Sequence, residues 1–120
     1  MKLIDTNVIL RFLLNDVDSQ SKIAKEAIAK GTFTIPEVIA EVVYVLTFVY
    51  KEPRENVSRI LNLFMDNISV SEKAIIKEAL SQYANTSLDY VDCVLFARAK
   101  ILGEDVLTFD AKLRKKMDNI

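Results

Sequence analysis

The chain has 120 residues, of which 51% are hydrophobic and 28% charged, a size and composition that suit one folded domain with a substantial core. Its 16 basic and 17 acidic residues give a net charge of −1, so overall charge neither indicates nor excludes a nucleic-acid partner. With no histidine and only two glycines, it cannot form histidine-dependent triads, most zinc sites, phosphate-binding loops or dinucleotide fingerprints.

The cellular setting is also limited by the sequence. No apolar run approaches the ~18 residues that a bilayer-spanning helix needs, so we expect no membrane segment. Asp5 interrupts the apolar start of the chain, which argues against a secretory signal. The single cysteine, Cys93, rules out internal disulfides. We therefore expect a protein of the reducing cytoplasm.

The first part of the chain predicts a strand followed by two helices. An apolar run at residues 2–4 indicates a buried strand, and residues 6–14 repeat apolar side chains at helical spacing. Asp18 or Ser19 can cap a second, amphipathic helix, and Gly31 is expected to end it in a left-handed conformation.

The middle of the chain predicts a second strand, residues 32–34, and then two more helices. The sequence "TIPE" predicts a capping box at the start of the first, with Thr34 as the cap and Glu37 three residues later. That helix is expected to reach about Tyr50, because Pro53 cannot continue it. The sequence "PRENVSRILNLFMDN" predicts the other helix.

The last part of the chain predicts a third strand at residues 68–70, the helix "SEKAIIKEALSQYA", and the helix "LDYVDCVLFARAKIL", which stops at Gly103. Residues 105–109 predict the last strand, and "AKLRKK" starts a closing helix. Strands separated by helices indicate a parallel sheet with crossover connections. The predicted fold is therefore three-layer α/β/α with a central parallel sheet, as one domain over residues 1–120.

Two aspartates follow apolar strands of this prediction. Asp5 ends the first strand and Asp110 ends the last. In open parallel sheets the carboxyl ends of the strands form the edge where ligands bind. Either residue could instead be a helix cap, which is a common role of aspartate, and one side chain can do both.

Three further acids lie on predicted helices. Glu41 is about two turns into an almost wholly apolar helix, too deep for capping, and a buried glutamate needs a partner. Asp92 lies near the start of another apolar helix, with Asp89 one turn earlier. A favourable interaction with the positive end of the helix dipole explains the position of Asp89 better than that of Asp92. For Glu41 the alternatives are an ion pair with a lysine or arginine, or convergence with the other acids.

Convergence requires a counter-charge, because two carboxylates ~4 Å apart repel by ~4 kcal/mol at an effective dielectric near 20. A divalent cation removes that repulsion. Oxygen donors without histidine or clustered thiolates select Mg²⁺ or Mn²⁺ over zinc. Water bound to such a metal can attack phosphorus, so the reaction class that we expect is phosphodiester hydrolysis.

Four segments together resemble a PIN-domain ribonuclease, and their order and the chain length are most similar to the VapC toxins of toxin–antitoxin pairs. These segments are "LIDTNVILRFLL", "EVIAEVVYVL", "LDYVDCVLFARAKILG" and "VLTFD". The resemblance covers nearly the whole chain and implies a PIN-like fold.

The resemblance also implies a site and partners. The acidic, metal-holding catalytic positions of the family match four residues, Asp5, Glu41, Asp92 and Asp110. Asn7 and Thr108 match supporting polar positions, and Asp89 matches an acid that some members carry. The family implies a Mg²⁺ or Mn²⁺ cofactor, cleavage of RNA, a homodimer, and neutralisation by a cognate antitoxin protein.

Other functions are open at this point. The chain could be a PIN-fold nuclease of RNA processing or repair outside a toxin pair, or a PIN-like binding module without catalysis. An aspartyl-phosphate enzyme is disfavoured because "DTN" has Asn7 where a second acid is expected. A basic run near the C-terminus could contact RNA phosphates or form a solvated face, and consists of Lys112, Arg114, Lys115 and Lys116.

Overall fold

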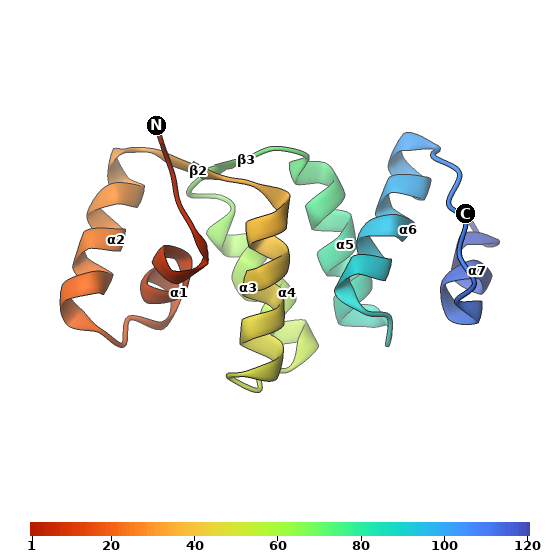
Figure 1. Ribbon diagram of the computed structural model, residues 1–120, viewed down its shortest axis with the longest axis horizontal. Helices are drawn as coiled ribbons and strands as arrows, with labels where there is room; N and C mark the ends of the chain where they lie inside the picture. The colour runs from red at the N-terminus through yellow and green to blue at the C-terminus, as the bar shows by residue number, and fades with distance from the viewer.

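The computed structural model describes residues 1–120 as short strands separated by helices (Figure 1). The strands are β1 Lys2–Leu3, β2 Thr32–Thr34 and β3 Ser69–Val70. The helices are α1 Thr6–Leu14, α2 Asp18–Lys30, α3 Pro36–Phe48, α4 Arg54–Phe64, α5 Lys73–Asn85, α6 Tyr90–Leu102 and α7 Ala111–Met117. None of these helices combines the length and the apolar character that a bilayer span requires.

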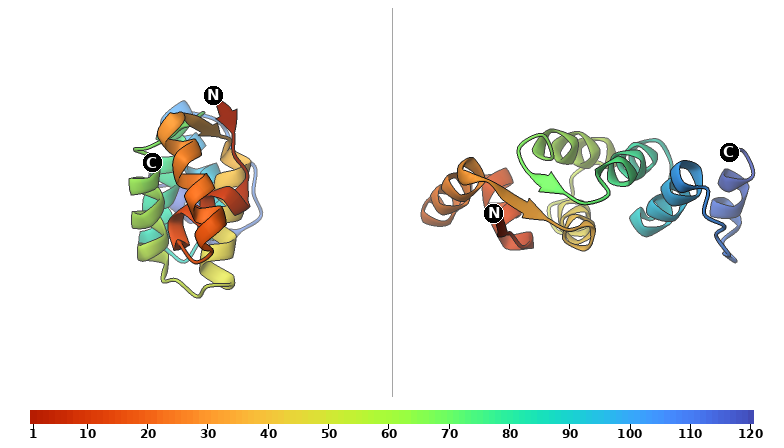
Figure 2. Two further views of the ribbon diagram at one scale, coloured as in Figure 1. Left: turned by 90° about the vertical axis from the view of Figure 1, so that its left-hand side faces the viewer. Right: turned by 90° about the horizontal axis from the view of Figure 1, so that it is seen from above.

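The strands form a parallel sheet in the order β1-β2-β3, with Lys2 opposite Thr32 and Phe33 opposite Ser69. Parallel strands need crossover connections, and helices supply them here: α1 and α2 between β1 and β2, α3 and α4 between β2 and β3. Seen from above, α3 lies on one side of the strands and α4 and α5 lie on the other (Figure 2). The predicted α/β fold with a central parallel sheet is confirmed.

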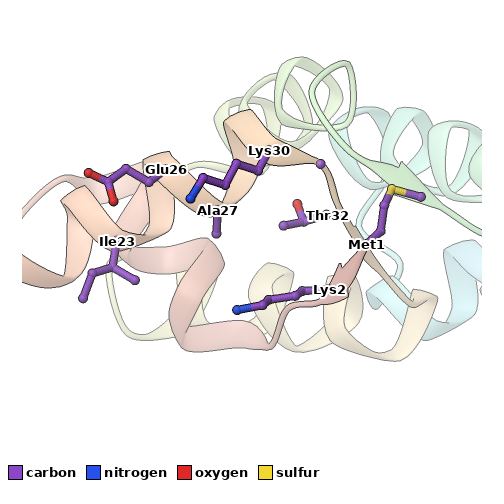
Figure 3. A pocket seen from close by; sticks show the side chains of 8 residues that line it. Met1, Lys2, Ile23, Glu26, Ala27, Lys30 and Thr32 are labelled. Carbon is purple, nitrogen blue, oxygen red and sulfur yellow. The ribbon is translucent and has the colours of Figure 1, made fainter.

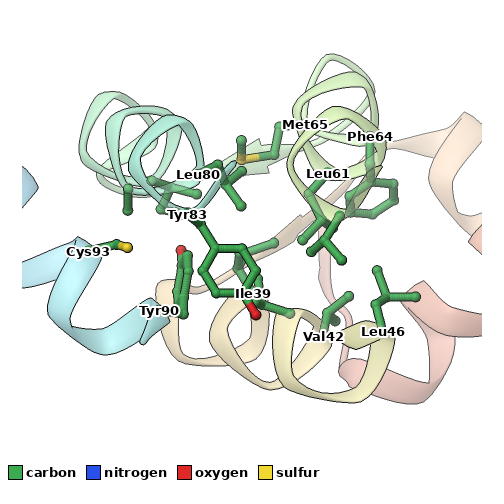
Figure 4. Packing of buried hydrophobic residues seen from close by; sticks show 14 of the residues in the cluster. Ile39, Val42, Leu46, Leu61, Phe64, Met65, Leu80, Tyr83, Tyr90 and Cys93 are labelled. Carbon is green, nitrogen blue, oxygen red and sulfur yellow. The ribbon is translucent and has the colours of Figure 1, made fainter. Parts of the chain in front are cut away.

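The core lies where α3, α4 and α5 face one another (Figure 4). Ile39 and Val42 of α3 are fully buried, as are Leu61 of α4 and Leu80 of α5. Each belongs to a stripe at helical spacing, and burial of one such side chain contributes about 1.5–3 kcal/mol. Tyr83 of α5 closes this core next to the start of α6, so the packing fixes the end of α6 that carries two of the candidate acids.

The predicted capping box at "TIPE" is wrong. Ile35, not Thr34, is the N-cap of α3, and it makes no capping hydrogen bond through its side chain. The Thr34 hydroxyl instead donates to the Ile4 carbonyl oxygen at 3.0 Å and so ties β2 to the end of β1. Pro36 begins the helix with a preset φ and without an N–H that would need a partner, so α3 starts without the cap.

The predicted strand at residues 105–109 is also wrong. These residues take part in no backbone–backbone hydrogen bond and connect α6 to α7 without regular structure. A strand needs a neighbour to pair with, and this connection lies at the end of the molecule away from β1 (Figure 1). Leu107 and Phe109 are therefore 88% and 91% exposed.

Candidate active site

Asp5 lies where β1 turns into α1. It is the N-cap of α1, and its Oδ1 accepts a hydrogen bond from the Val8 N–H at 3.1 Å. Asp5 is therefore a helix cap, as one of the two interpretations of the sequence predicted. Its other carboxylate oxygen and the exposed Asn7 lie at the same end of the helix and are free to bind a ligand. Asp5, Asn7 and Arg11 line one side of a shallow hollow against α2. The Arg11 Nη1 forms an ion pair with the Asp16 Oδ1 at 3.0 Å.

Glu41 is exposed on α3, contrary to the expectation that its apolar neighbours would bury it. The helix turns Ile39, Val42 and Val43 into the core and leaves Glu41 outside. It forms no ion pair, so the structural alternative of a lysine or arginine partner is not realised either. Because α1 and α3 pack together, Glu41 and Asp5 lie on neighbouring elements.

Asp92 is half-buried in the first turn of α6. Burial raises the pKa of its carboxyl, and the neighbouring carboxylates of Asp110 and Asp89 raise that pKa further. Asp89 is the N-cap of α6 and Asp110 is the N-cap of α7. The packing of α6 against α7 thus brings together acids that are 18 or more residues apart in the chain.

Thr108 supports the backbone on which Asp110 lies. Its Oγ1 accepts a hydrogen bond from the Asp110 N–H at 3.0 Å, and its carbonyl oxygen accepts one from Arg114 at 2.8 Å. The Asp110 Oδ1 in turn accepts from the Leu113 N–H at 2.9 Å. These bonds fix the Asp110 side chain at the start of α7, with one carboxylate oxygen free.

Asp89, Asp92 and Asp110 lie near one another at the starts of α6 and α7, whereas Asp5 lies at the start of α1 and Glu41 on α3, which packs against both α1 and α6. Oxygen donors are suited to Mg²⁺, but no three acidic or cysteine side chains come close enough to hold a metal ion. The expected pocket of four acids is not formed within one copy. In this arrangement the four candidate acids do not gather around one point, and their role as metal ligands stays a prediction.

Arg54 is a positioning residue that the sequence did not reveal. It lies in the first turn of α4, and its Nε donates to the Tyr83 carbonyl oxygen at 2.8 Å while its Nη2 donates to the Leu88 carbonyl oxygen. Its guanidinium also lies 3.7 Å from the centroid of the Tyr83 ring. Arg54 thus fastens the loop that leads into Asp89 and α6. Its partners are 29 or more residues away along the chain, and a local sequence pattern does not predict contacts of that range.

Three lysines gather around a hollow of about 370 Å³ between α7 and the loop before α6. They are Lys112, Lys115 and Lys116, and Lys112 donates to the Ser87 hydroxyl at 3.2 Å. None of them forms an ion pair. Because Asp110 caps the same helix, this basic hollow lies close to the group of acids at Asp92.

A small parallel sheet with helical crossovers, with acids at a strand end and at helix starts, describes a PIN domain. The family model described as "PIN domain" matches residues 2–118, and the chain belongs to this family. It is similar to a VapC ribonuclease from Aquifex aeolicus (strain VF5): the alignment has 123 positions with 32% identity and covers 96% of this chain and 91% of that protein. No solved structure matches the chain. The family predicted from the four segments is confirmed.

Proposed function

We propose that this PIN domain is an endoribonuclease that hydrolyses RNA phosphodiester bonds with Mg²⁺ or Mn²⁺. It acts in the cytoplasm as the toxin of a type II toxin–antitoxin system and is neutralised by a cognate antitoxin. The observation that carries the proposal is the likeness to a VapC ribonuclease along 96% of the chain. The candidate catalytic acids are Asp5, Glu41, Asp92 and Asp110, with Asn7, Thr108 and Asp89 in support.

The charges around Asp92 agree with this assignment. Three carboxylates lie close together there, and no basic side chain forms an ion pair with any of them. Uncompensated acids of this kind attract cations and would repel an RNA phosphate in the absence of a cation. The proposed activity therefore depends on a divalent cation.

The test is an RNA degradation assay with the purified chain. Cleavage is expected with Mg²⁺ or Mn²⁺, and it should stop when EDTA is added or when Asp5 is replaced in Asp5→Asn. Cleavage that persists in EDTA or in the variant contradicts the metal dependence. A chain that cuts no RNA with either metal contradicts the enzyme proposal and supports a binding module.

The basic hollow is expected to bind RNA phosphates next to the acids. Replacing two of its lysines in a Lys112→Gln/Lys115→Gln variant should weaken RNA binding and reduce the salt dependence of log Kd by about 0.7 for each phosphate that is no longer neutralised, the value for single strands. The measurement is RNA binding by fluorescence anisotropy at several salt concentrations, with Mg²⁺ and with Asp5→Asn added to every protein compared so that no cleavage occurs. The matched control is Lys22→Gln/Lys25→Gln, which removes two exposed lysines of α2. Equal losses in both variants would contradict a dedicated phosphate site.

A further inference from the structure

A second hollow, of about 440 Å³, lies between the strands and α2 (Figure 3). Lys2, the first residue of β1, and Thr32, the first residue of β2, line it, whereas Asp5 follows the other end of β1. Ala27 of α2 faces it with a single methyl group, which leaves the space open. The hollow is therefore at the end of the sheet away from Asp5, and it shares no residue with the basic hollow at α7.

The turn from α2 into β2 brings two lysines to this hollow. α2 ends at Lys30, and Gly31 leads into β2 with a φ of +101°, a conformation that glycine adopts without strain. In the parallel ladder Lys2 lies opposite Thr32, so the two side chains project from the same face of the sheet. Lys2 and Lys30 consequently flank Thr32 (Figure 3).

The charges of the two lysines are not neutralised within the protein. Both side chains are exposed, and neither forms an ion pair. Glu26 also lines the hollow and precedes Lys30 by four residues, the spacing of a helical ion pair, but the pair does not form. The Glu26 carboxylate points away from Thr32 (Figure 3). Two free ammonium groups beside one hollow favour a ligand with two negative charges.

The wall between the lysines has a buried hydroxyl group without a partner. Thr32 is 1% exposed, and its Oγ1 forms no hydrogen bond. Thr34 of the same strand is equally buried, but its hydroxyl donates to the Ile4 carbonyl oxygen at 3.0 Å. A buried hydroxyl without a partner destabilises the fold, and nearly all such groups are satisfied by protein, water or a ligand. Because Thr32 lines the hollow, an acceptor bound there can receive its hydrogen bond.

We propose that this hollow binds the phosphate group of a small ligand. Lys2 and Lys30 neutralise the charge of the phosphate, and the Thr32 hydroxyl donates to one of its oxygens. Lysine acts as a compact point charge in phosphate sites, and a phosphate monoester carries a charge of about −1.5 to −2 at neutral pH, which matches two lysines. The volume of the hollow exceeds the size of a bare phosphate and is typical of a site for a small organic molecule.

The first test measures phosphate binding at this hollow by nuclear magnetic resonance. Inorganic phosphate is titrated into the labelled protein in EDTA, and the amide signal of Gly31 is expected to shift until the site is saturated. Lys2→Gln/Lys30→Gln should weaken this binding by about tenfold or more, because two charge-assisted contacts are lost. The matched control is Lys22→Gln/Lys25→Gln, which removes two exposed lysines of α2 that do not line the hollow. Equal losses in both variants, or no saturable shift, overturn the proposal.

The second test compares two threonines of β2 that differ in their partners. Thr32→Val removes the hydroxyl without a partner, so it should not lower the midpoint of thermal unfolding in the absence of phosphate, but it should weaken phosphate binding by about fivefold. Thr34→Val loses the bond to Ile4, so it should lower the midpoint and leave the affinity unchanged. A Thr32→Val protein that binds phosphate as tightly as the unchanged protein overturns the proposal. A midpoint as low as that of Thr34→Val also overturns it, because the hydroxyl would then have a partner within the protein.

The third test identifies the source of the phosphate group. Adenosine 5′-monophosphate is expected to shift the same Gly31 signal, and adenosine, which has no phosphate, should not. Tighter binding of the monophosphate than of inorganic phosphate supports a nucleotide or another phosphate ester, and equal binding supports free phosphate. Binding of adenosine as tight as that of its monophosphate overturns the phosphate site.

A last measurement distinguishes a small ligand from RNA. A single-stranded RNA without terminal phosphates is added to the complex with adenosine 5′-monophosphate, in Mg²⁺ and with Asp5→Asn in the protein so that the RNA stays intact. The monophosphate is expected to remain bound at the hollow. Its displacement by the RNA overturns the small-ligand assignment and shows that the lysines contact the RNA backbone. These readouts do not require RNA cleavage, so they are independent of the proposed function.

Discussion

Replacing Asp92 with asparagine is expected to abolish RNA cleavage while making the metal-free protein more stable. The loss of activity should exceed about 100-fold, because removing even an outer partner of a metal ligand costs about 10–100-fold. The stability rises because the half-buried carboxylate of Asp92 is repelled by Asp110 and Asp89, and the neutral amide is not. Opposite signs for activity and stability distinguish a functional acid from a structural one.

The gain in stability depends on pH with a definite sign. The pKa of Asp92 is raised in the folded protein above 3.8, so the folded state holds its proton more tightly than the unfolded state. The free energy of unfolding therefore falls as the pH rises from the unfolded-state pKa of Asp92 to its folded-state pKa. Above the folded-state pKa the carboxylate is fully charged, and the loss of stability is complete. The advantage of Asp92→Asn should be full at neutral pH and vanish below the unfolded pKa.

Urea unfolding in EDTA at neutral and acidic pH measures this difference, and RNA cleavage with Mg²⁺ measures the activity. Mg²⁺ should raise the midpoint of thermal unfolding of the unchanged protein and have less effect on the variant, because binding to the folded state stabilises it. Asp66→Asn is the control, an exposed aspartate outside the candidate site, and should change neither quantity. An inactive variant that is less stable at neutral pH would show that Asp92 has a structural role.

Arg54→Met is expected to give the largest loss of stability among single changes outside the apolar core. The variant loses two charge-assisted hydrogen bonds to backbone carbonyl groups and the contact with the Tyr83 ring. Together these should lower the free energy of unfolding by about 3 kcal/mol, since such bonds contribute about 1.5–3 kcal/mol each and a cation–π contact about 0.5–2, less what water restores to the carbonyls. Chemical denaturation measures the loss.

The same change should loosen the loop before α6. Hydrogen exchange is expected to rise in residues 84–90, because the carbonyls of Tyr83 and Leu88 lose the side chain that holds them together. Arg59→Met is the matched control on the same helix, since Arg59 is exposed and makes no hydrogen bond or ion pair, and it should change stability by no more than about 0.5 kcal/mol. Similar losses in both variants would show that the effect comes from the charge of α4 and not from the loop contacts.

Most helices could be predicted from the sequence because the information for them is local. The apolar spacing of "PRENVSRILNLFMDN" predicts a helix, and α4 buries Val57, Leu61 and Phe64 at that spacing. Gly103 ends α6 with a φ of +68°, a conformation that glycine adopts without strain. The capping role of Asp5 is equally local, since its acceptor reaches an N–H three residues away.

The failures come from competition between local and distant partners. Thr34 has the right spacing to Glu37 for a capping box, but its hydroxyl finds the Ile4 carbonyl 30 residues away. Glu41 was expected to be buried because its neighbours are apolar on all sides. A helix that is apolar nearly all round does not show which stripe faces the core, and the packing of α4 and α5 decided that Ile39 and Val42 do.

The sequence by itself determined the order of the helices and of the first three strands, the family, and the chemical type of the candidate site, carboxylate oxygens without imidazole or clustered thiol. Only the tertiary structure decided that Asp92 meets Asp110 and Asp89, that Arg54 holds the loop before them, and that residues 105–109 remain without a partner. The physical reason is range: a helix is stabilised by bonds between residues four apart, whereas a sheet ladder, a charge cluster and a metal site join residues whose separation along the chain leaves no periodic signal.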